Sequence, residues 1–114
     1  MHTREELYIG GQWVEPLGEG TIEVVNPAND ELIGSVPVGS AADVDAAVAA
    51  AHSAFPSWSQ TPVGERVEFL NRLSAAIKEQ TEDLSQLITA EVGTPINYCR
   101  MAMVGTPKVV SRSY

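Results

Sequence analysis

The sequence predicts an α/β fold in which two β-hairpins are followed by amphipathic helices. Short β-branched and aromatic runs alternate with turn residues over positions 7–38, and from position 40 the apolar residues recur with the 3.6-residue period of a helix. With 114 residues, 44% of them hydrophobic, the chain is long enough for one domain at most. We expect residues 1–6 to be disordered, 7–38 to form the hairpins and 40–114 to form the helices.

The first hairpin is expected where two short apolar or aromatic runs flank Gly10 and Gly11. Glycine readily takes the positive φ angles that a two-residue hairpin turn requires. A second pair of strands is predicted at residues 21–26 and 32–38. The break between them falls at Pro27, which cannot donate to a strand ladder.

The first helix is predicted to begin after Ser40. Asp43 stands three residues later, which is the spacing of a capping box, and Pro56 is expected to end the helix. A stripe of apolar residues on one helix face needs another surface to cover it. The members of this stripe are Val44, Ala47, Val48, Ala51 and Phe55.

A second helix is predicted with Thr61 as its N-cap and Pro62 in its first turn. The residues that it is expected to bury are Phe69, Leu70, Leu73 and Ile77. Thr81 is predicted to cap a third helix, which Gly93 ends. The Thr-Pro pairs at 94–95 and 106–107 repeat the cap-and-proline start, the second pair after a break at position 105.

The acidic balance of the chain argues against nucleic acid as a partner. The formal net charge is -8, and the basic residues are scattered, whereas binding to a phosphate backbone requires clustered Lys and Arg. No apolar run approaches the roughly 20 residues that a membrane-spanning helix needs, and the first residues do not resemble a secretory signal. We therefore expect no membrane segment and a cytoplasmic location.

Few side chains are candidates for chemistry. Cys99 is the single cysteine, and neither His2 nor His52 stands at a spacing that would place it beside the thiol. A partly buried small apolar residue is the favoured interpretation of Cys99, and a surface or edge histidine that of His52. The aromatic residues Trp13, Phe55 and Trp58 are interpreted as core rather than as a stacking platform. The acidic residues on the predicted helices are interpreted as lying on solvated helix faces or in a capped first turn. They are Glu65, Glu68, Glu79, Glu82 and Asp83.

Several segments, taken in order, resemble the aldehyde dehydrogenase superfamily. Residues 91–95 look like the family's acid-x-Gly-x-Pro corner, and residues 112–114 like the start of its Arg-Tyr-Tyr stretch. The other matching segments are 8–14, 25–28, 32–36, 43–48, 54–58 and 66–73. Each is weak alone, but their order and spacing are specific. The fold is thus predicted to be aldehyde-dehydrogenase-like, with residues 1–114 as an amino-terminal segment that lacks the complete cofactor-domain sheet.

The resemblance implies oxidation of an aldehyde to a carboxylic acid. In the family a cysteine thiolate attacks the carbonyl, hydride passes to bound NAD or NADP, and water activated by a glutamate hydrolyses the thioester. The family's nucleophile stands in a Gly-Gln-x-Cys context and its base in a Glu-Leu-Gly-Gly run, neither of which occurs here. Cys99 is therefore not the family's nucleophile. We expect no catalytic or cofactor-binding residue in this segment, which alone should be inactive.

The resemblance also implies two smaller roles. Family members hold a structural monovalent cation through main-chain oxygens near the Asn-Pro turn and the acid of the corner, positions that match Val24 or Val25 and Glu91. The helix after position 95 lines the substrate tunnel in relatives, which would place Ala102 and Thr106 near its mouth. Plain packing is the alternative for each position.

Two interpretations of the chain stay open. The first is a segment of a full aldehyde dehydrogenase, whose partners would be an aldehyde, the rest of the parent chain and, at full length, further copies in a homo-oligomer. This interpretation predicts helix faces that stay uncovered within the 114 residues. The second is a stand-alone, non-catalytic interaction or assembly module derived from the same fold.

Overall fold

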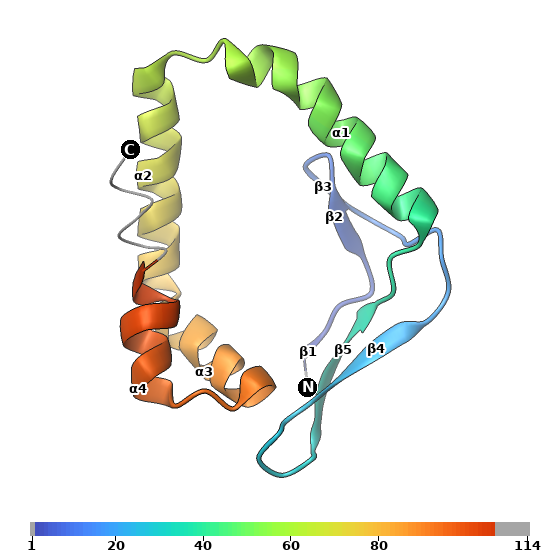
Figure 1. Ribbon diagram of the computed structural model, residues 1–114, viewed down its shortest axis with the longest axis vertical. Coiled ribbons are helices and arrows are strands. Elements are labelled where there is room, and N and C mark those ends of the chain that lie inside the picture. Colours follow the sequence, from blue (N-terminus) through green and yellow to red (C-terminus); the bar gives the residue numbers. More distant parts are fainter. Residues whose placement is uncertain (1, 107–114) are drawn as a thin grey trace. The chain divides into compact units, whose positions relative to one another are not determined.

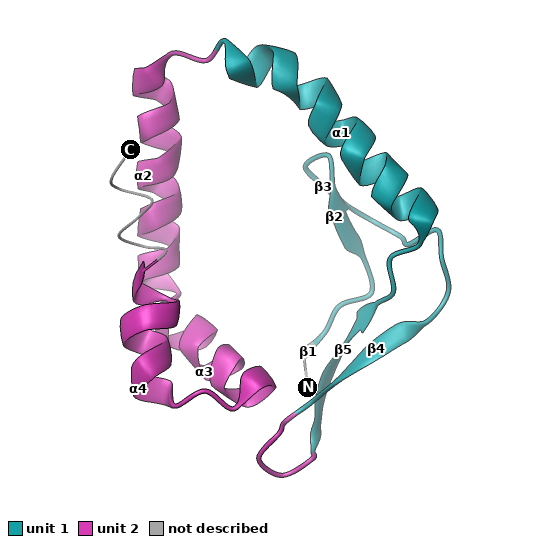
Figure 2. Cartoon of the chain, viewed as in Figure 1, with its two compact units in different colours: residues 1–25, 31–60 teal, residues 26–30, 61–114 magenta. Residues whose placement is uncertain are grey.

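The computed structural model of the chain describes residues 2–106 (Figure 1). The β-strands precede the helices in this range, as the sequence predicts. The chain divides into two compact units (Figure 2). Unit 1 comprises residues 1–25 and 31–60, and unit 2 comprises residues 26–30 and 61–114.

A two-stranded antiparallel sheet begins unit 1. Strands β2 (Leu7–Ile9) and β3 (Gln12–Val14) pair across a turn in which Gly10 and Gly11 have φ angles of 62° and 83°. This confirms the predicted glycine hairpin, because positive φ at both central residues is what its turn type requires. A Cβ on Gly10 would lie 3.7 Å from the Cβ of Ala50, so the turn lies against the first helix.

The second sheet has the strand order β1-β5-β4. Strands β4 (Thr21–Val25) and β5 (Leu32–Pro37) form the second predicted hairpin, and β1 (His2–Thr3) adds in parallel to β5. The backbone N–H of Arg4 continues this pairing by donating to the carbonyl of Ser35 over 3.0 Å.

The expectation that residues 1–6 are disordered is corrected for residues 2–4, which β1 and the Arg4 hydrogen bond pair with β5. Backbone groups dominate this contact, and the residues of β1 form no hydrophobic pattern that would signal a strand. The open edge of β5 supplies carbonyl and N–H groups that need partners. A two-residue strand of this kind forms only by pairing with β5, and the sequence of residues 2–3 does not indicate that pairing.

The β4–β5 connection, residues 26–30, is a turn built around Asn26. The side-chain Oδ1 of Asn26 accepts from the N–H of Ala28 over 2.9 Å, and its carbonyl accepts from the N–H of Asp30 over 2.8 Å. Asp30 has a φ of 58°, in the left-handed region that Asn and Asp tolerate better than most residues. The predicted break at Pro27 is therefore confirmed.

Helix α1 (Ala41–Ser59) starts with the predicted capping box. The N–H of Asp43 donates to Ser40 Oγ over 3.3 Å, and the N–H of Ser40 donates to Asp43 Oδ2 over 2.8 Å. Asp43 also accepts from the backbone N–H of Leu17 over 2.9 Å, which ties the preceding loop to the helix start. The hydrogen bond from Leu17 contributes most to lowering the pKa of the buried Asp43 carboxyl below 3.8, and those from Ser40 add to it.

Pro56 lies inside α1 and does not end it. Proline removes one backbone donor and therefore one hydrogen bond to the preceding turn, but the residues after it still donate. The N–H of Gln60, for example, reaches the carbonyl of Ser57 over 3.2 Å and closes the last turn. The prediction was wrong because Pro56 removes only its own backbone donor, and the last turn closes through hydrogen bonds of the residues after it.

Unit 2 contains α2 (Val63–Glu79), α3 (Thr81–Val92), α4 (Ile96–Tyr98) and the π-helix η1 (Cys99–Met103). Helix α2 begins after Pro62 without a side-chain cap, so the assignment of Thr61 as N-cap was wrong. The proline ring presets the backbone for the first turn without one.

Thr81 begins α3 but does not cap it through its side chain. Its hydroxyl donates backward to the carbonyls of Ile77 (3.2 Å) and Lys78 (2.9 Å), at the end of α2. The predicted end of α3 at Gly93 is confirmed. Gly105, where a break was predicted, is helical together with Thr106; Pro107 lies outside the described residues.

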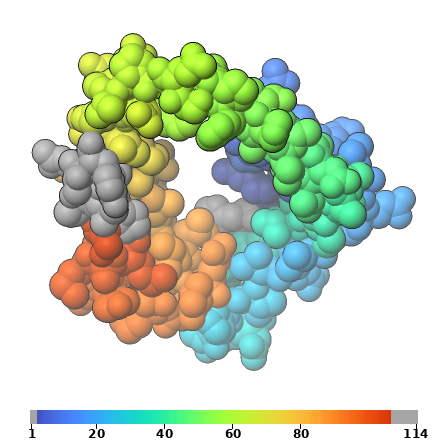
Figure 3. All heavy atoms as spheres, turned by 45° about the horizontal axis from the view of Figure 1, so that its top comes forward, coloured from blue at the N-terminus to red at the C-terminus, as the bar shows by residue number. Residues whose placement is uncertain are grey.

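Apolar side chains remain uncovered on α1 and α2. All five members of the α1 stripe are exposed, and the atoms of α1, green in Figure 3, lie open to view along the helix. Phe69 and Leu73, which were expected to be buried on α2, are also exposed. Leu70 and Ile77 are half-buried. The predicted uncovered helix faces are thus present, and the prediction that α2 buries its stripe was wrong for two of four residues.

Candidate functional site

The corner after α3 joins two distant parts of unit 2. Gly93 has a φ of 76° and its N–H donates to the carbonyl of Thr89 over 2.9 Å, which ends the helix in the left-handed form. A Cβ built on Gly93 would lie 3.0 Å from Pro27 Cγ. The Asn-Pro turn therefore lies directly against the Glu-Val-Gly-Thr-Pro corner, although the two segments are far apart in the sequence.

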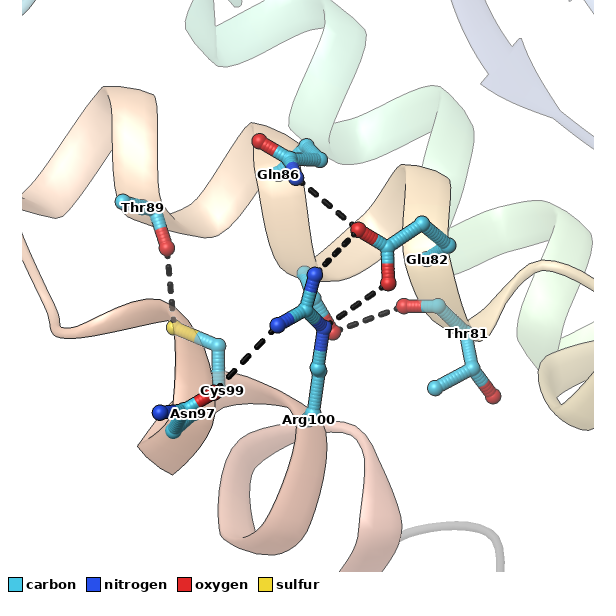
Figure 4. Close-up of polar contacts among 8 residues, drawn as sticks. Thr81, Glu82, Gln86, Thr89, Asn97, Cys99 and Arg100 are labelled. Carbon is cyan, nitrogen blue, oxygen red and sulfur yellow. Dashed lines mark hydrogen bonds and ion pairs between the residues drawn. The ribbon is translucent and has the colours of Figure 1, made fainter.

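Cys99 lies buried behind this corner. Its side chain is fully inaccessible, and the Thr89 hydroxyl donates to its sulfur over 3.4 Å (Figure 4). The thiol donates in turn to the carbonyl of Thr94 over 3.6 Å, and the Met103 sulfur is 4.0 Å away. Cys99 was expected to be partly buried, and the structure buries it completely. In this structure the thiol is shielded from solvent.

Arg100 binds a carboxylate on α3. Its Nε and Nη2 donate to the two oxygens of Glu82 over 2.8 and 2.6 Å, and its Nη1 donates to Asn97 Oδ1 over 3.3 Å (Figure 4). Gln86 donates to Glu82 Oε1 over 2.9 Å. This bidentate pair links the first turn of α3 to η1, and we call Glu82, Gln86, Asn97 and Arg100 the clasp.

The clasp changes the acidity of its carboxyl. Hydrogen bonding to Arg100, and then to Gln86, lowers the pKa of Glu82 from 4.5 to about 2, and the same contact raises the pKa of Arg100. Both side chains remain substantially exposed, at 41% for Arg100 and 58% for Glu82. Solvent therefore screens the electrostatic attraction between them, and the bidentate hydrogen-bond geometry is better evidence for the pair than the pKa shift.

The predicted cation ligands lie on two elements. Val24 and Val25 are consecutive in β4, and the register shifts between them because Val24 pairs with Gly34 and Val25 with Leu32. The extra residue is Ile33 on β5, so the irregularity lies in the strand opposite the two valines. Glu91 is exposed in the last turn of α3. The two valines belong to unit 1 and Glu91 to unit 2.

The predicted tunnel residues lie on the last described segment. Ala102 is half-buried within η1, and Thr106 is exposed. Their positions relative to an aldehyde remain a prediction.

Aromatic side chains near the strand and helix ends are exposed, contrary to the interpretation of them as core. The exposed fractions are 54% for Trp13, 66% for Phe55 and 46% for Trp58. Trp13 contacts Tyr8 at a ring-centroid distance of 5.1 Å and carries the Arg4 guanidinium 5.5 Å from its ring centroid. It borders an open polar hollow of about 590 Å³ in unit 1. His52 is exposed, as expected.

Residues 2–106 contain no helix of the length and apolar character needed to cross a membrane. The same residues hold no group of three or more His, Cys, Asp or Glu side chains that could bind a metal ion.

Solved structures share this fold closely. An aldehyde dehydrogenase from Bartonella henselae matches 100% of this chain, and 24% of its own, with a TM-score of 0.93 and 28% identity. A mutant of aldehyde dehydrogenase C from Pseudomonas syringae, complexed with NAD+ and octanal, matches 95% of this chain and 22% of its own, with a TM-score of 0.90 and 42% identity. The fold is therefore that of the amino-terminal part of an aldehyde dehydrogenase.

The sequence leads to the same family. A model described as the aldehyde dehydrogenase family matches residues 13–112. A 3-succinoylsemialdehyde-pyridine dehydrogenase from a Pseudomonas species is 38% identical over 96 residues, which are 84% of this chain and 20% of that protein. The chain belongs to the aldehyde dehydrogenase family, which confirms the inferred resemblance. It spans about a fifth of the length of the relatives that it matches.

The clasp was not foreseen from the sequence. The sequence pattern places Glu82 in a solvated or capped first turn, and Arg100 is one of the scattered basic residues. The two lie 18 positions apart on different helices, so no helix-face spacing connects them. The available signal was the sharp corner at Gly93, since a chain that turns back there brings the next helix alongside α3.

Proposed function

We propose that this chain is the amino-terminal segment of an NAD(P)-dependent aldehyde dehydrogenase, in which it serves as scaffold. The observation that carries the proposal is the family match over residues 13–112, combined with full burial of Cys99, the chain's only thiol. The parent would oxidise an aldehyde to a carboxylic acid through a cysteine thioester. Its nucleophile, its general base and its cofactor-binding residues would lie outside these 114 residues.

The uncovered helix faces support a scaffold role. Val44 and Val48 are 57% and 61% exposed on α1, and Phe69 and Leu73 are similarly uncovered on α2. Removing such side chains from water is favourable by about 25 cal/mol per Å² of apolar surface. These faces would lie against the rest of the parent chain. The cofactor proposal rests on the family and on the relative that was crystallised with NAD+.

The test compares residues 1–114 with the protein encoded by the complete reading frame, each purified and assayed with octanal and either NAD+ or NADP+. We expect turnover by the complete protein and none by the 114-residue chain. The variant Cys99→Ser of the complete protein should keep its turnover within about twofold, since a buried residue that touches no reacting atom leaves transition-state binding unchanged.

The matched control replaces the cysteine of the Gly-Gln-x-Cys context by Ser in the complete protein, which should abolish turnover. Loss of acylation in a correctly folded Cys99→Ser protein would overturn the proposal. A reading frame without that context would favour the second candidate, a non-catalytic interaction module. The same uncovered faces on α1 and α2 fit that candidate.

We also propose that a monovalent cation is held by a main-chain oxygen of Val24 or Val25 together with the Glu91 carboxylate. The match of these positions to the family's Asn-Pro turn and corner acid, and the exposure of Glu91, support this donor set. In the complete protein, K+ or Na+ should raise Tm relative to choline at equal ionic strength, and Glu91→Gln should remove the difference. A wild-type Tm that does not distinguish these cations would contradict the site.

We propose further that Ala102 and Thr106 border the entrance to the substrate site of the parent. Ala102 lies in η1 and Thr106 in the helical residues that follow it. Enlarging Ala102 to Leu in the complete protein should raise KM for octanal more than for propanal, because a longer chain fills more of an entrance. Equal KM changes for both aldehydes would argue for plain packing.

A further inference from the structure

The helical segment after the corner contains a π turn. The N–H of Val104 donates to the carbonyl of Cys99, five residues earlier, over 2.9 Å. An α-helix would instead pair Val104 with the carbonyl of Arg100. Isolated π turns are rare and occur frequently at functional sites. Something in the surroundings must favour this form over the ordinary one.

The clasp acts on the first turn of η1. The side chain of Arg100 is drawn to Glu82 on α3 by two charge-assisted hydrogen bonds of 2.8 and 2.6 Å (Figure 4). Asn97, one turn earlier, accepts from the same guanidinium over 3.3 Å. The direction of the Arg100 side chain is thereby fixed from two sides, and with it the rotation of this turn about the helix axis.

The backbone near the end of η1 is also adapted to the wider turn. A Cβ on Gly105 would lie 3.1 Å from the carbonyl oxygen of Arg100, tighter than ordinary van der Waals contact. Glycine thus leaves room for this carbonyl in the present geometry. Val104 and Cys99, which make the π hydrogen bond, are the two buried hydrophobic residues among those described.

We infer that the Glu82–Arg100 pair holds residues 99–103 in the π form and acts as a register latch, meaning that it fixes the rotation of residues 104–106 about the helix axis. When the pair opens, the Val104 N–H moves to the Arg100 carbonyl and the segment becomes α-helical. The turn then contains one residue fewer, so the side chains of residues 104–106 rotate by about 100° around the helix axis. Ala102 lies within the turn that changes, and Thr106 follows it.

The consequence for catalysis rests on the proposed function. If Ala102 and Thr106 border the substrate entrance, the latch determines which side chains face the aldehyde. Arg100 is then a positioning residue that touches no reacting atom. Its effect should fall on KM for long aldehydes and leave kcat for short ones nearly unchanged.

The direct test uses NMR couplings across hydrogen bonds in isotope-labelled chain 1–114, because they identify which carbonyl each N–H reaches. The wild type should show a coupling between the Val104 amide and the Cys99 carbonyl. In Arg100→Met, which removes the charge but keeps an extended side chain, this coupling should be replaced by one to the carbonyl of residue 100. Glu82→Gln should give the same replacement.

Two controls make the result decisive. Arg72→Met, the same change at an arginine that stacks on Phe69 in α2, should leave the Cys99 coupling intact. The charge-reversed double variant Glu82→Arg with Arg100→Glu should restore it. Persistence of the Cys99 coupling in a folded Arg100→Met or Glu82→Gln chain overturns the latch, as does its absence from the wild type.

A kinetic arm in the complete enzyme separates this inference from the proposed function. Arg100→Met should raise KM for octanal by about threefold or more, with kcat for propanal changed by less than about twofold. A wild-type enzyme without turnover contradicts the proposed function and leaves the NMR result standing. A normal KM for octanal in a variant that has lost the π hydrogen bond overturns the positioning role.

Discussion

Gly93 shows how one residue can hold a corner of the molecule. It ends α3 at a φ of 76° and lies so close to Pro27 that a side chain would meet the proline ring at 3.0 Å. Both conditions favour glycine, one through the backbone and one through space. They have the same structural result, which is that α3 stops where the Asn-Pro turn reaches it.

Gly93→Ala should lower the free energy of unfolding by at least about 1–2 kcal/mol, the cost of the left-handed conformation for a residue with a Cβ. The control is Gly64→Ala in α2, where a Cβ would meet no heavy atom within 4 Å. That change should be neutral or stabilising by up to about 1 kcal/mol. Urea unfolding at 25 °C measures both, and equal effects would contradict the role assigned to Gly93.

Glu82 gives a prediction for pH. Its pKa falls from 4.5 to about 2 on folding, so the pair contributes its full stabilisation above pH 4.5 and loses it as the pH drops toward 2. The urea midpoints of wild type and Glu82→Gln should therefore differ most above pH 4.5 and converge between pH 4.5 and about 2. Asp43 titrates in both proteins and cancels in the comparison.

The difference between these two midpoints should also shrink in about 1 M NaCl, because both side chains of the pair are exposed and salt screens them. A difference that grows as the pH falls, or that is unchanged from pH 6 to pH 2, would show that Glu82 is not the group that titrates. Arg72→Met provides a basic-residue change outside the clasp for comparison.

At the scale of elements, the start of α1 is where local sequence determined structure most completely. The capping box places Ser40 and Asp43 within a single turn, and its spacing is visible in the sequence. The loop residue Leu17, which donates to the same carboxylate, could not be foreseen, because it lies 26 positions away. The cap thus has a local part that the sequence predicts and a tertiary part that it does not.

Ser40→Ala should destabilise the chain by about 1 kcal/mol, the usual cost of losing an N-cap side chain. Ser59→Ala, at the other end of α1, removes only an exposed hydroxyl that donates to the carbonyl of Pro56, and its effect should stay within about 0.5 kcal/mol. Thermal unfolding followed by circular dichroism distinguishes the two. Similar losses of stability would mean that the capping box does not stabilise α1.

Turn chemistry and helix period predicted most elements, and tertiary contacts account for the failures. The glycine hairpin, the Asn26 turn and the stop at Gly93 all depend on φ angles that few residues adopt, so their signals are local. The strand at 2–3 and the clasp depend on partners far along the chain. Helix period likewise marks an apolar face without revealing whether anything in the same chain covers it.

At the scale of the whole molecule, the uncovered apolar faces are the main result. Phe55 is 66% exposed on α1, although an amphipathic helix of a complete domain normally buries such a residue. These faces make the chain a component of something larger under the proposed function. The effect of a substitution on these faces should therefore differ between the 114-residue chain and the complete parent.

Phe55→Ala should change the stability of the 114-residue chain by no more than about 0.5 kcal/mol, because little area is lost from a side chain already in water. In the complete parent the same change should cost about 3–5 kcal/mol, the value for a buried aromatic residue. Asp45→Ala, an exposed neighbour on α1, should have a small effect in both. A small cost of Phe55→Ala in the parent would contradict burial of this face.

The contact between Pro27 and Gly93 constrains the order in which the chain can fold. Residues 26–30 are synthesised within the β4–β5 hairpin but belong to unit 2, whose helices follow much later. Strands β4 and β5 can pair early through local contacts. The contact between Pro27 and Gly93 can form only after α3 has been synthesised. No single backbone cut yields both units intact. A fragment starting at residue 61 would lack the turn that Gly93 lies against. Proteolysis at residue 60 would leave that turn, residues 26–30, on the fragment that carries unit 1.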